Sequence, residues 1–184
     1  MSSSKNRPTK ALGKDTKQAI ENYETSKEQS DKMSILSSLD KNFKPSKKQQ
    51  EFLKVIDNNI ATIVHGSAGT GKTITSVYKG LYEAIKENKR LILIRPIFES
   101  AQEKLGFLPG ELEEKLTPHK KAFMYTLDEL IGYNLAQELI ASNKIRFEVL
   151  NYLRGATIPN AVIICDEAQN MTLDELMLAI TRIG

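Results

Sequence analysis

The stretch HGSAGTGKT, residues 65–73, decides how this chain folds. It contains the pattern G-x-x-x-x-G-K-[ST] and lies between an apolar run and a stretch with helical spacing, the context in which the pattern has meaning. Its glycines allow positive φ and close approach to an anion, and successive N–H groups of such a loop point into one concavity. The sequence therefore predicts a phosphate-binding loop. Its residues are Gly66, Ser67, Ala68, Gly69, Thr70, Gly71, Lys72 and Thr73.

Two side chains of this loop are of types that suit a bound nucleotide. Lys72 offers a mobile positive charge to the β- and γ-phosphates, and the hydroxyl of Thr73 is a ligand for Mg²⁺. The helix expected after the loop adds the positive end of its dipole. We therefore expect ATP and Mg²⁺ to bind at residues 66–73.

A second motif lies near the end of the sequence, where the apolar run 162–165 leads into Asp166 and Glu167. In phosphate-loop proteins an acid at the end of a second buried strand holds Mg²⁺, and Asp166 has that position. Glu167 is the natural base or orienter for an attacking water, and the amide of Gln169 can sense the γ-phosphate. A carboxylate beside the metal acid favours hydrolysis, because a kinase must exclude water.

Strand and helix signals alternate along the rest of the chain. Apolar runs predict buried strands, and alternating apolar and polar residues predict a half-exposed strand. The expected strands are 60–65, 90–96, 144–151 and 161–167. The expected helices are 45–59, 73–88, 111–125, 127–141 and 172–182, with a loop at 97–110. This order predicts an α/β fold with a mainly parallel sheet and helices on both faces.

Composition bounds the class of protein. Hydrophobic residues make up 40% of the 184 positions, enough for a core. No apolar run approaches the roughly 18–20 residues of a membrane span, and the polar, basic start is not a secretory signal. The one cysteine, Cys165, excludes an internal disulfide, and we interpret it as a small buried hydrophobe. These features predict a cytoplasmic protein.

The net charge of +3 belongs to the N-terminal segment. Residues 1–48 hold 11 Lys and Arg against 6 Asp and Glu, a balance of +5, whereas residues 49–184 hold 15 against 17, a balance of −2. A segment so polar cannot bury enough to offset its ordering entropy. We therefore expect residues 1–43 to be a mostly disordered tail with a short helix around Met33–Leu39, either solvated or a basic arm on nucleic acid. Residues 44–184 form the expected domain.

Four segments together resemble the PhoH-like family of P-loop ATPases. They are HGSAGTGKT, IRPIFESAQEKLGFLPGELEEKL, NYLRGATIPNAVIICDEAQN and LAITRIG. The resemblance runs from about residue 44 to the end, and its EKLGFLPG and YLRG segments are much more specific than the phosphate loop. It implies a RecA-like core similar to superfamily 1 helicases, ATP hydrolysis, single-stranded RNA or DNA as a partner, and ring-shaped homo-oligomers.

In that family the chain continues beyond TRIG into another core strand, which carries a polar sensor of the γ-phosphate. The resemblance therefore implies that this chain is truncated at its C-terminal end. We expect an uncovered edge of the sheet and a protein that binds nucleotide better than it hydrolyses it.

The resemblance also suggests roles for weaker signals. Gln49 lies where helicase-like proteins place a glutamine that reads the adenine edge, although the adjacent Gln50 leaves the register open. Arg95, at a strand end, either contacts nucleic acid or forms an ion pair. Arg154 either contacts the γ-phosphate or a neighbouring subunit, or caps a turn. Arg182 is either an arginine finger or a cation at a helix C-terminus.

Aromatic and histidine side chains give no independent signal of function. His65 and His119 lack a metal-ligand partner and are expected to be structural. Tyr78, Tyr82 and Phe107 are expected in the core or at its rim rather than stacked on bases.

Two other classes of protein stay open. A nucleotide-binding switch or assembly module would share the phosphate loop but show little or no turnover. A small-molecule kinase would need an arginine-rich lid, and no arginine cluster follows the loop.

Overall fold

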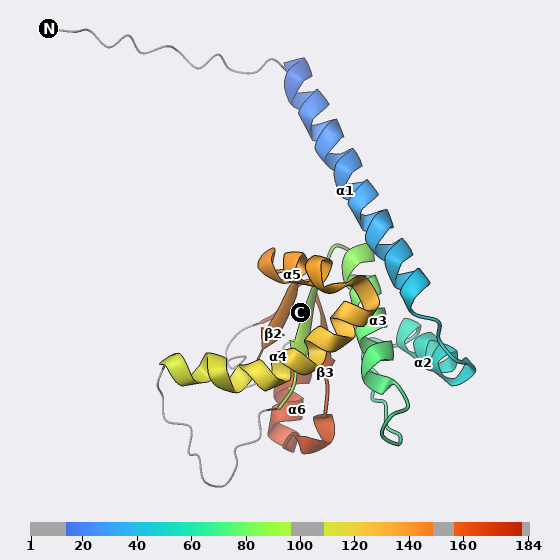
Figure 1. Cartoon of the computed structure of the whole chain (residues 1–184), viewed down its shortest axis with the longest axis vertical. Coiled ribbons are helices and arrows are strands. Elements are labelled where there is room, and N and C mark those ends of the chain that lie inside the picture. Colours follow the sequence, from blue (N-terminus) through green and yellow to red (C-terminus); the bar gives the residue numbers. More distant parts are fainter. Residues whose placement is uncertain (1–13, 97–108, 149–156, 182–184) are drawn as a thin grey trace, which may run out of the picture. The chain divides into compact units, whose positions relative to one another are not determined.

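The computed structural model describes residues 14–96, 109–148 and 157–181, and the chain divides into two compact units, Met1–Ser34 and Ile35–Gly184. The helices are α1 (Lys14–Asn42), α2 (Lys47–Asp57), α3 (Lys72–Lys86), α4 (Pro109–Ile131), α5 (Tyr133–Ala141) and α6 (Leu173–Ile180). The strands are β1 (Arg90–Ile94), β2 (Ile145–Glu148) and β3 (Ala161–Cys165), and a 3₁₀ turn, η2 (Ala168–Asn170), follows β3. Figure 1 shows these elements along the chain.

Three parallel strands form the sheet, in the order β2-β1-β3. Leu91 of β1 lies opposite Ile145 of β2 on one side and opposite Val162 of β3 on the other. β1 is buried along nearly its whole length, whereas every residue of β3 is only half-buried. The structure confirms the predicted α/β fold with a parallel sheet, and β1 is the central strand.

The strands serve two cores, one on each face of the sheet. Leu91 and Leu93 point into the larger core, which α3, α4 and α5 complete. Ile92 and Ile94 point into the smaller core, where Ala179 of α6 joins them. Successive residues of a strand face opposite sides, so one apolar run supplies both cores. The predicted helices on both faces are therefore confirmed (Figure 1).

Polar side chains fix the starts of two helices near the functional site. Ser46 caps α2 and pairs reciprocally with Gln49, and Thr172 caps α6 and pairs in the same way with Glu175. Such a capping box satisfies backbone donors that a helix start leaves without partners. α4 runs on to Ile131, past the helix end expected near residue 125, and Gly132, with φ of 81°, separates it from α5.

The segment 60–65 differs from its prediction as a buried strand. Its backbone forms no strand, and the side chains of Ile60 and Ile63 are 98% and 82% exposed. A strand exists only where a neighbouring strand supplies backbone partners, and among the described residues β3 pairs with β1 alone. The apolar run 60–65 has the composition of a strand, but it pairs with no strand of the described sheet. Among the described strands, β3 therefore lies at an edge of the sheet.

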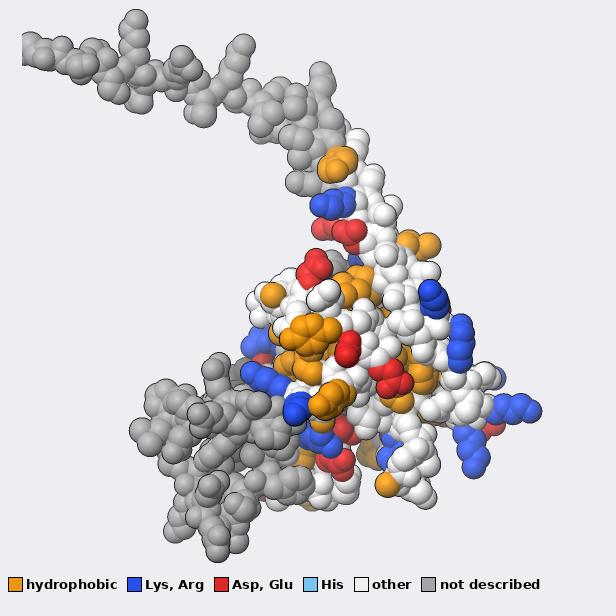
Figure 2. Space-filling model, viewed as in Figure 1, with side chains coloured by type: hydrophobic (Ala, Val, Ile, Leu, Met, Phe, Trp, Pro, Cys, Tyr) orange, Lys and Arg blue, Asp and Glu red, His pale blue; other side chains and the backbone are white. Residues whose placement is uncertain are grey.

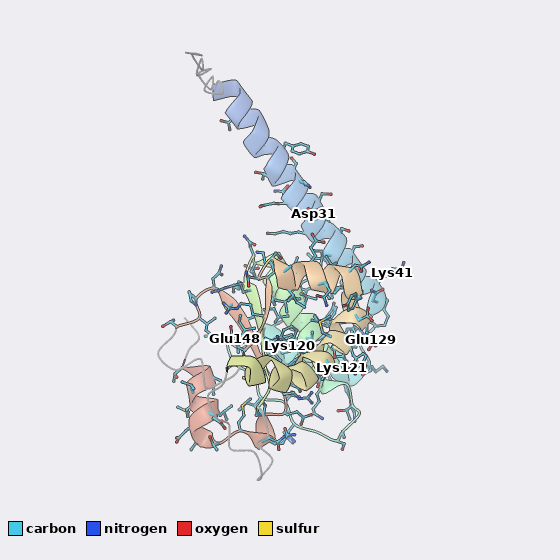
Figure 3. The ribbon with its side chains drawn as sticks, turned by 60° about the vertical axis from the view of Figure 1, so that its left-hand side comes forward. Asp31, Lys41, Lys120, Lys121, Glu129 and Glu148 are labelled. Carbon is cyan, nitrogen blue, oxygen red and sulfur yellow. The ribbon has the colours of Figure 1, made fainter. Side chains whose placement is uncertain are left out.

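Helix α1 is longer than the short helix predicted around Met33–Leu39, because it begins at Lys14. In the unit Met1–Ser34 its described side chains are nearly all exposed, Asp31 among them (Figure 3). Its last turns belong to the other unit, where Leu39 is fully buried and Phe43, just beyond the helix, is 8% exposed. The average composition of residues 1–43 is polar, so it does not indicate the burial of Leu39 and Phe43 at the end of the segment.

The second compact unit begins at Ile35. Within the described ranges, no helix is both long enough and apolar enough to cross a bilayer.

Candidate active site

The predicted phosphate loop forms a turn that leads directly into a helix. Gly69 and Gly71 have φ of 75° and 78°, in the left-handed region that favours glycine. Gly71 is the N-cap of α3, so the free N–H groups of that helix start face the loop. Oγ1 of Thr70 donates to the carbonyl of Ser67 at 2.9 Å and closes the turn over Ala68. A loop of this form before a helix N-terminus is suited to bind phosphate.

The ammonium group of Lys72 lies over the loop. It donates to the carbonyl oxygens of Gly66 and Ser67, at 2.9 and 2.8 Å. Both acceptors belong to the first residues of the loop, so the side chain turns back from α3 across the turn. Its charge is therefore placed where it can meet an anion that the loop N–H groups bind.

A hydroxyl and a carboxylate meet beside the loop. Oγ1 of Thr73 donates to Oδ1 of Asp166 at 3.0 Å. Asp166 follows β3 directly, and its N–H donates to the carbonyl of Ile94 at 2.9 Å, which extends the pairing of β3 with β1 by one residue. Oxygen atoms of this kind are the ligands that Mg²⁺ prefers. The two side chains therefore fit the predicted Mg²⁺ site.

Glu167 is held by two donors, one on each carboxylate oxygen. Nη2 of Arg95 donates to Oε1 at 2.9 Å, and Nε2 of Gln169 donates to Oε2. Two hydrogen bonds lower the pKa of Glu167, and the one from Arg95 has the larger effect and the one from Gln169 the smaller. Slight burial opposes this effect, and the charges of Arg95 and Lys72 add to it. The carboxyl group is therefore ionised at neutral pH.

Arg95 thus forms the ion pair that was one of its two predicted roles. Its Nη2 also lies 3.8 Å from Oδ2 of Asp166, so one guanidinium faces both acids. Arg95 and Glu167 are both candidates from the sequence, but their pairing is seen only in the structure. The signal for the pair is that both residues follow neighbouring parallel strands, whose carboxyl ends meet at one edge of the sheet.

Gln49 lies beside the phosphate loop, and Gln50 does not. A Cβ atom on Gly71 would come within 2.6 Å of Nε2 of Gln49, so this amide touches the start of α3. Oε1 of Gln49 accepts from the N–H of Ser46 at 2.8 Å. Nε2 of Gln50 instead donates to the carbonyl of Pro45 at 3.1 Å. The structure thus places Gln49 at the loop, while its contact with adenine stays a prediction.

The structure describes only some of the remaining candidate site residues. Those outside the described ranges are Arg154, Arg182 and Phe107. The side chain of His119 is also outside them, and His65 is exposed. Among the described residues, no cluster of three or more His, Cys, Asp and Glu side chains could hold a metal ion. Tyr78 and Tyr82 pack against the larger core, as predicted.

Comparison with known proteins shows which protein family this chain resembles. The sequence model described as PhoH-like protein matches residues 43–184. The chain is similar to a "PhoH-like protein" of Synechocystis, with 40% identity over 139 residues, and to a "PhoH-like protein" of Bacillus subtilis, with 38% identity over 138 residues. It is also similar to "Protein PhoH" of Escherichia coli, with 36% identity over 139 residues.

These similarities cover most of this chain and a smaller part of its relatives. Each of the three alignments covers 74% of this chain. They cover 42%, 43% and 39% of the Synechocystis, Bacillus subtilis and Escherichia coli proteins. The chain therefore spans less than half the length of these curated relatives.

Proposed function

The chain belongs to the PhoH-like protein family, and we propose that it binds ATP at residues 66–73 and hydrolyses it with Asp166 and Glu167. The observation that carries this proposal is the hydrogen bond from Thr73 to Asp166, at 3.0 Å. It joins the phosphate loop to the strand end that bears the two acids. Phosphoryl transfer needs phosphate-binding groups and a water-activating group within the reach of one triphosphate.

Each residue of the site has a role in this proposal. The loop N–H groups and Lys72 bind the β- and γ-phosphates. Thr73 and Asp166 hold Mg²⁺, which when bound neutralises charge that develops on the phosphate oxygens. Glu167 orients a water molecule and accepts its proton. Gln49 reads the adenine edge, and Gln169 senses the γ-phosphate.

Nucleotide binding by a matched pair of lysine-to-alanine variants tests this proposal. Lys72→Ala removes the ammonium group over the loop, whereas Lys86→Ala removes an exposed one at the far end of the same helix. We expect titration calorimetry to show ATP binding for the wild type and Lys86→Ala and no binding for Lys72→Ala. Equal binding by all three proteins would overturn the assignment of the loop.

We also propose single-stranded nucleic acid as a partner, which the family resemblance supports. Basic and acidic side chains are mixed on the face drawn in Figure 2, so no uniform basic tract marks a path there. On α4, Lys121 lies 6.0 Å from the ring centre of the exposed Tyr125, next to Lys120 (Figure 3). A cation beside an exposed aromatic ring suits a stacked base.

Fluorescence anisotropy with a labelled single-stranded oligonucleotide tests this partner. We expect Tyr125→Ala to weaken binding, and the same change at the exposed Tyr23 of α1 to leave binding unchanged. Unaltered affinity in Tyr125→Ala would exclude the ring as a contact.

A further inference from the structure

Each carboxylate oxygen of Glu167 already accepts one hydrogen bond, and the two donors fix the orientation of the group. Oε1 accepts from Nη2 of Arg95 and Oε2 accepts from Nε2 of Gln169. A general base must lie within hydrogen-bond reach of the proton that it takes, with an oxygen lone pair directed at the water. The side chain is therefore in place for hydrolysis, but Arg95 and Gln169 set the direction of its remaining lone pairs and compete with a water molecule for the same oxygens.

The fold, rather than a chance surface encounter, sets this contact. Arg95 follows the central strand β1, and Glu167 follows β3 by two residues. The two strands pair up to Ile94 and Cys165, and the Asp166 N–H continues the pairing. The guanidinium and the two carboxylates are thus brought together by the ladder itself.

The backbone at Glu167 also departs from an ordinary strand end. Its φ is 55°, in the left-handed region that non-glycine residues seldom adopt. The carbonyl of Glu167 accepts from the N–H of Asn170 at 3.0 Å, within the η2 turn that also carries Gln169. Strained conformations of this kind persist where the surrounding structure fixes them, and they cluster at functional sites.

From this geometry we propose that Arg95 is a positioning residue that holds Glu167 in a resting pose, and that hydrolysis requires Arg95 to leave Glu167 for a phosphate group. This inference rests on the proposed function, because it assigns a controlling group to the same site. Arg95 can make such an exchange, since its side chain is 23% exposed and a guanidinium binds phosphate as well as carboxylate. The competing phosphate belongs either to the bound nucleotide or to a nucleic-acid strand.

The test uses Arg95→Met, which removes the donors and keeps a long apolar side chain in the partly buried position. The matched control is Arg146→Met, which removes the arginine of β2 that pairs with Glu148 at 2.6 Å, away from Glu167. Thermal unfolding and ATP titration first establish that each variant folds and binds nucleotide. Phosphate release at saturating Mg²⁺ and ATP then gives kcat and KM.

We expect Arg95→Met to raise kcat roughly fivefold with little change in KM, as suits the loss of one partly exposed charge-assisted hydrogen bond. Arg146→Met keeps the wild-type rate. In a Glu167→Gln background the same change at Arg95 has no effect, because its action passes through Glu167. An unchanged or lower kcat for Arg95→Met, or the same acceleration in the Glu167→Gln background, overturns the proposal.

Two further measurements show which phosphate group displaces Arg95 and whether a negative result excludes this inference or the proposed function. If a single-stranded oligonucleotide raises the wild-type rate to that of Arg95→Met and leaves the variant unchanged, the strand supplies the phosphate. If Arg95→Met is faster and the oligonucleotide has no effect, the nucleotide supplies it. If all variants bind ATP and none releases phosphate, hydrolysis itself is excluded and the inference with it. Turnover by the wild type that Arg95→Met does not exceed excludes the inference alone.

Discussion

Oγ1 of Thr73 donates a hydrogen bond to Oδ1 of Asp166 at 3.0 Å, although the two residues are 93 positions apart in the sequence. Thr73 belongs to the first turn of α3, which packs on β3, and Asp166 follows that strand. The contact therefore joins the turn at residues 66–71 and the two acids in one site.

Replacing Thr73 tests the predicted Mg²⁺ site. Thr73→Val keeps the shape of the side chain and removes the hydroxyl ligand. We expect the affinity for ATP in the presence of Mg²⁺ to fall about tenfold, in line with the loss of roughly one metal-ligand interaction. The affinity measured with EDTA should change much less. Calorimetry under both conditions checks this, with Thr126→Val, a hydroxyl on α4 that donates only to Ala122, as the control. An equal loss with and without Mg²⁺ would remove Thr73 from the metal site.

Gly80 allows α3 to approach the sheet closely. A Cβ atom there would lie 2.7 Å from Cδ1 of Ile164 and 3.0 Å from Cδ1 of Leu91. Alanine favours a helix by about 1 kcal/mol over glycine, but overpacking a core costs about 1–3 kcal/mol. We therefore expect Gly80→Ala to lower the free energy of unfolding in urea, where Lys86→Ala has little effect. If Gly80→Ala is more stable than the wild type, the gain in helix propensity exceeds the cost of overpacking.

The last turns of α1 contribute to the stability of the second unit. Leu39 is fully buried in the larger core, whereas Met33, earlier in the same helix, is 70% exposed. Removing a buried leucine side chain costs about 2–5 kcal/mol, and an exposed residue usually costs under about 0.5 kcal/mol. We expect Leu39→Ala to lower the melting temperature by several degrees and Met33→Ala to leave it nearly unchanged. Equal melting temperatures for Leu39→Ala and Met33→Ala would show that residues 35–43 do not stabilise the second unit.

Burial raises the pKa of the Cys165 thiol to about 11. The folded state therefore keeps the thiol protonated, and only about 0.1% of it is thiolate at pH 8, since each pH unit below the pKa lowers the thiolate fraction tenfold. We expect Cys165 to react slowly with a disulfide reagent in the native protein and quickly in denaturant. The native rate should rise as the pH approaches 11. Fast labelling of the native protein at pH 8 would contradict this burial.

The sequence predicted the elements that carry their own local signals. Helix α2 begins where Ser46 and Gln49 indicate, and α6 begins where Thr172 and Glu175 indicate. The glycine-rich turn before α3 and the position of Asp166 after a strand were likewise predicted, because glycines and apolar runs act within a few residues of the feature that they determine.

Features that depend on distant parts of the chain were less predictable. Residues 60–65 have the apolar composition of a strand, but no local pattern states whether a neighbouring strand will pair with them. The N-terminal part of α1 was not predicted, because residues 14–32 are mostly polar and carry no apolar periodicity that would indicate a helix. The ion pair of Arg95 with Glu167 needed the order of β1 and β3 in the sheet, which the sequence pattern does not contain.

Turnover by Glu167→Gln shows whether Glu167 acts as the base in ATP hydrolysis. The substitution keeps the size of the side chain and removes the carboxylate that is proposed to accept a proton from water. We expect the variant to bind ATP as the wild type does, and phosphate release at saturating Mg²⁺ and ATP to fall at least about 100-fold, the usual range for loss of a general base. Wild-type turnover in Glu167→Gln, with unaltered ATP binding, would contradict that role.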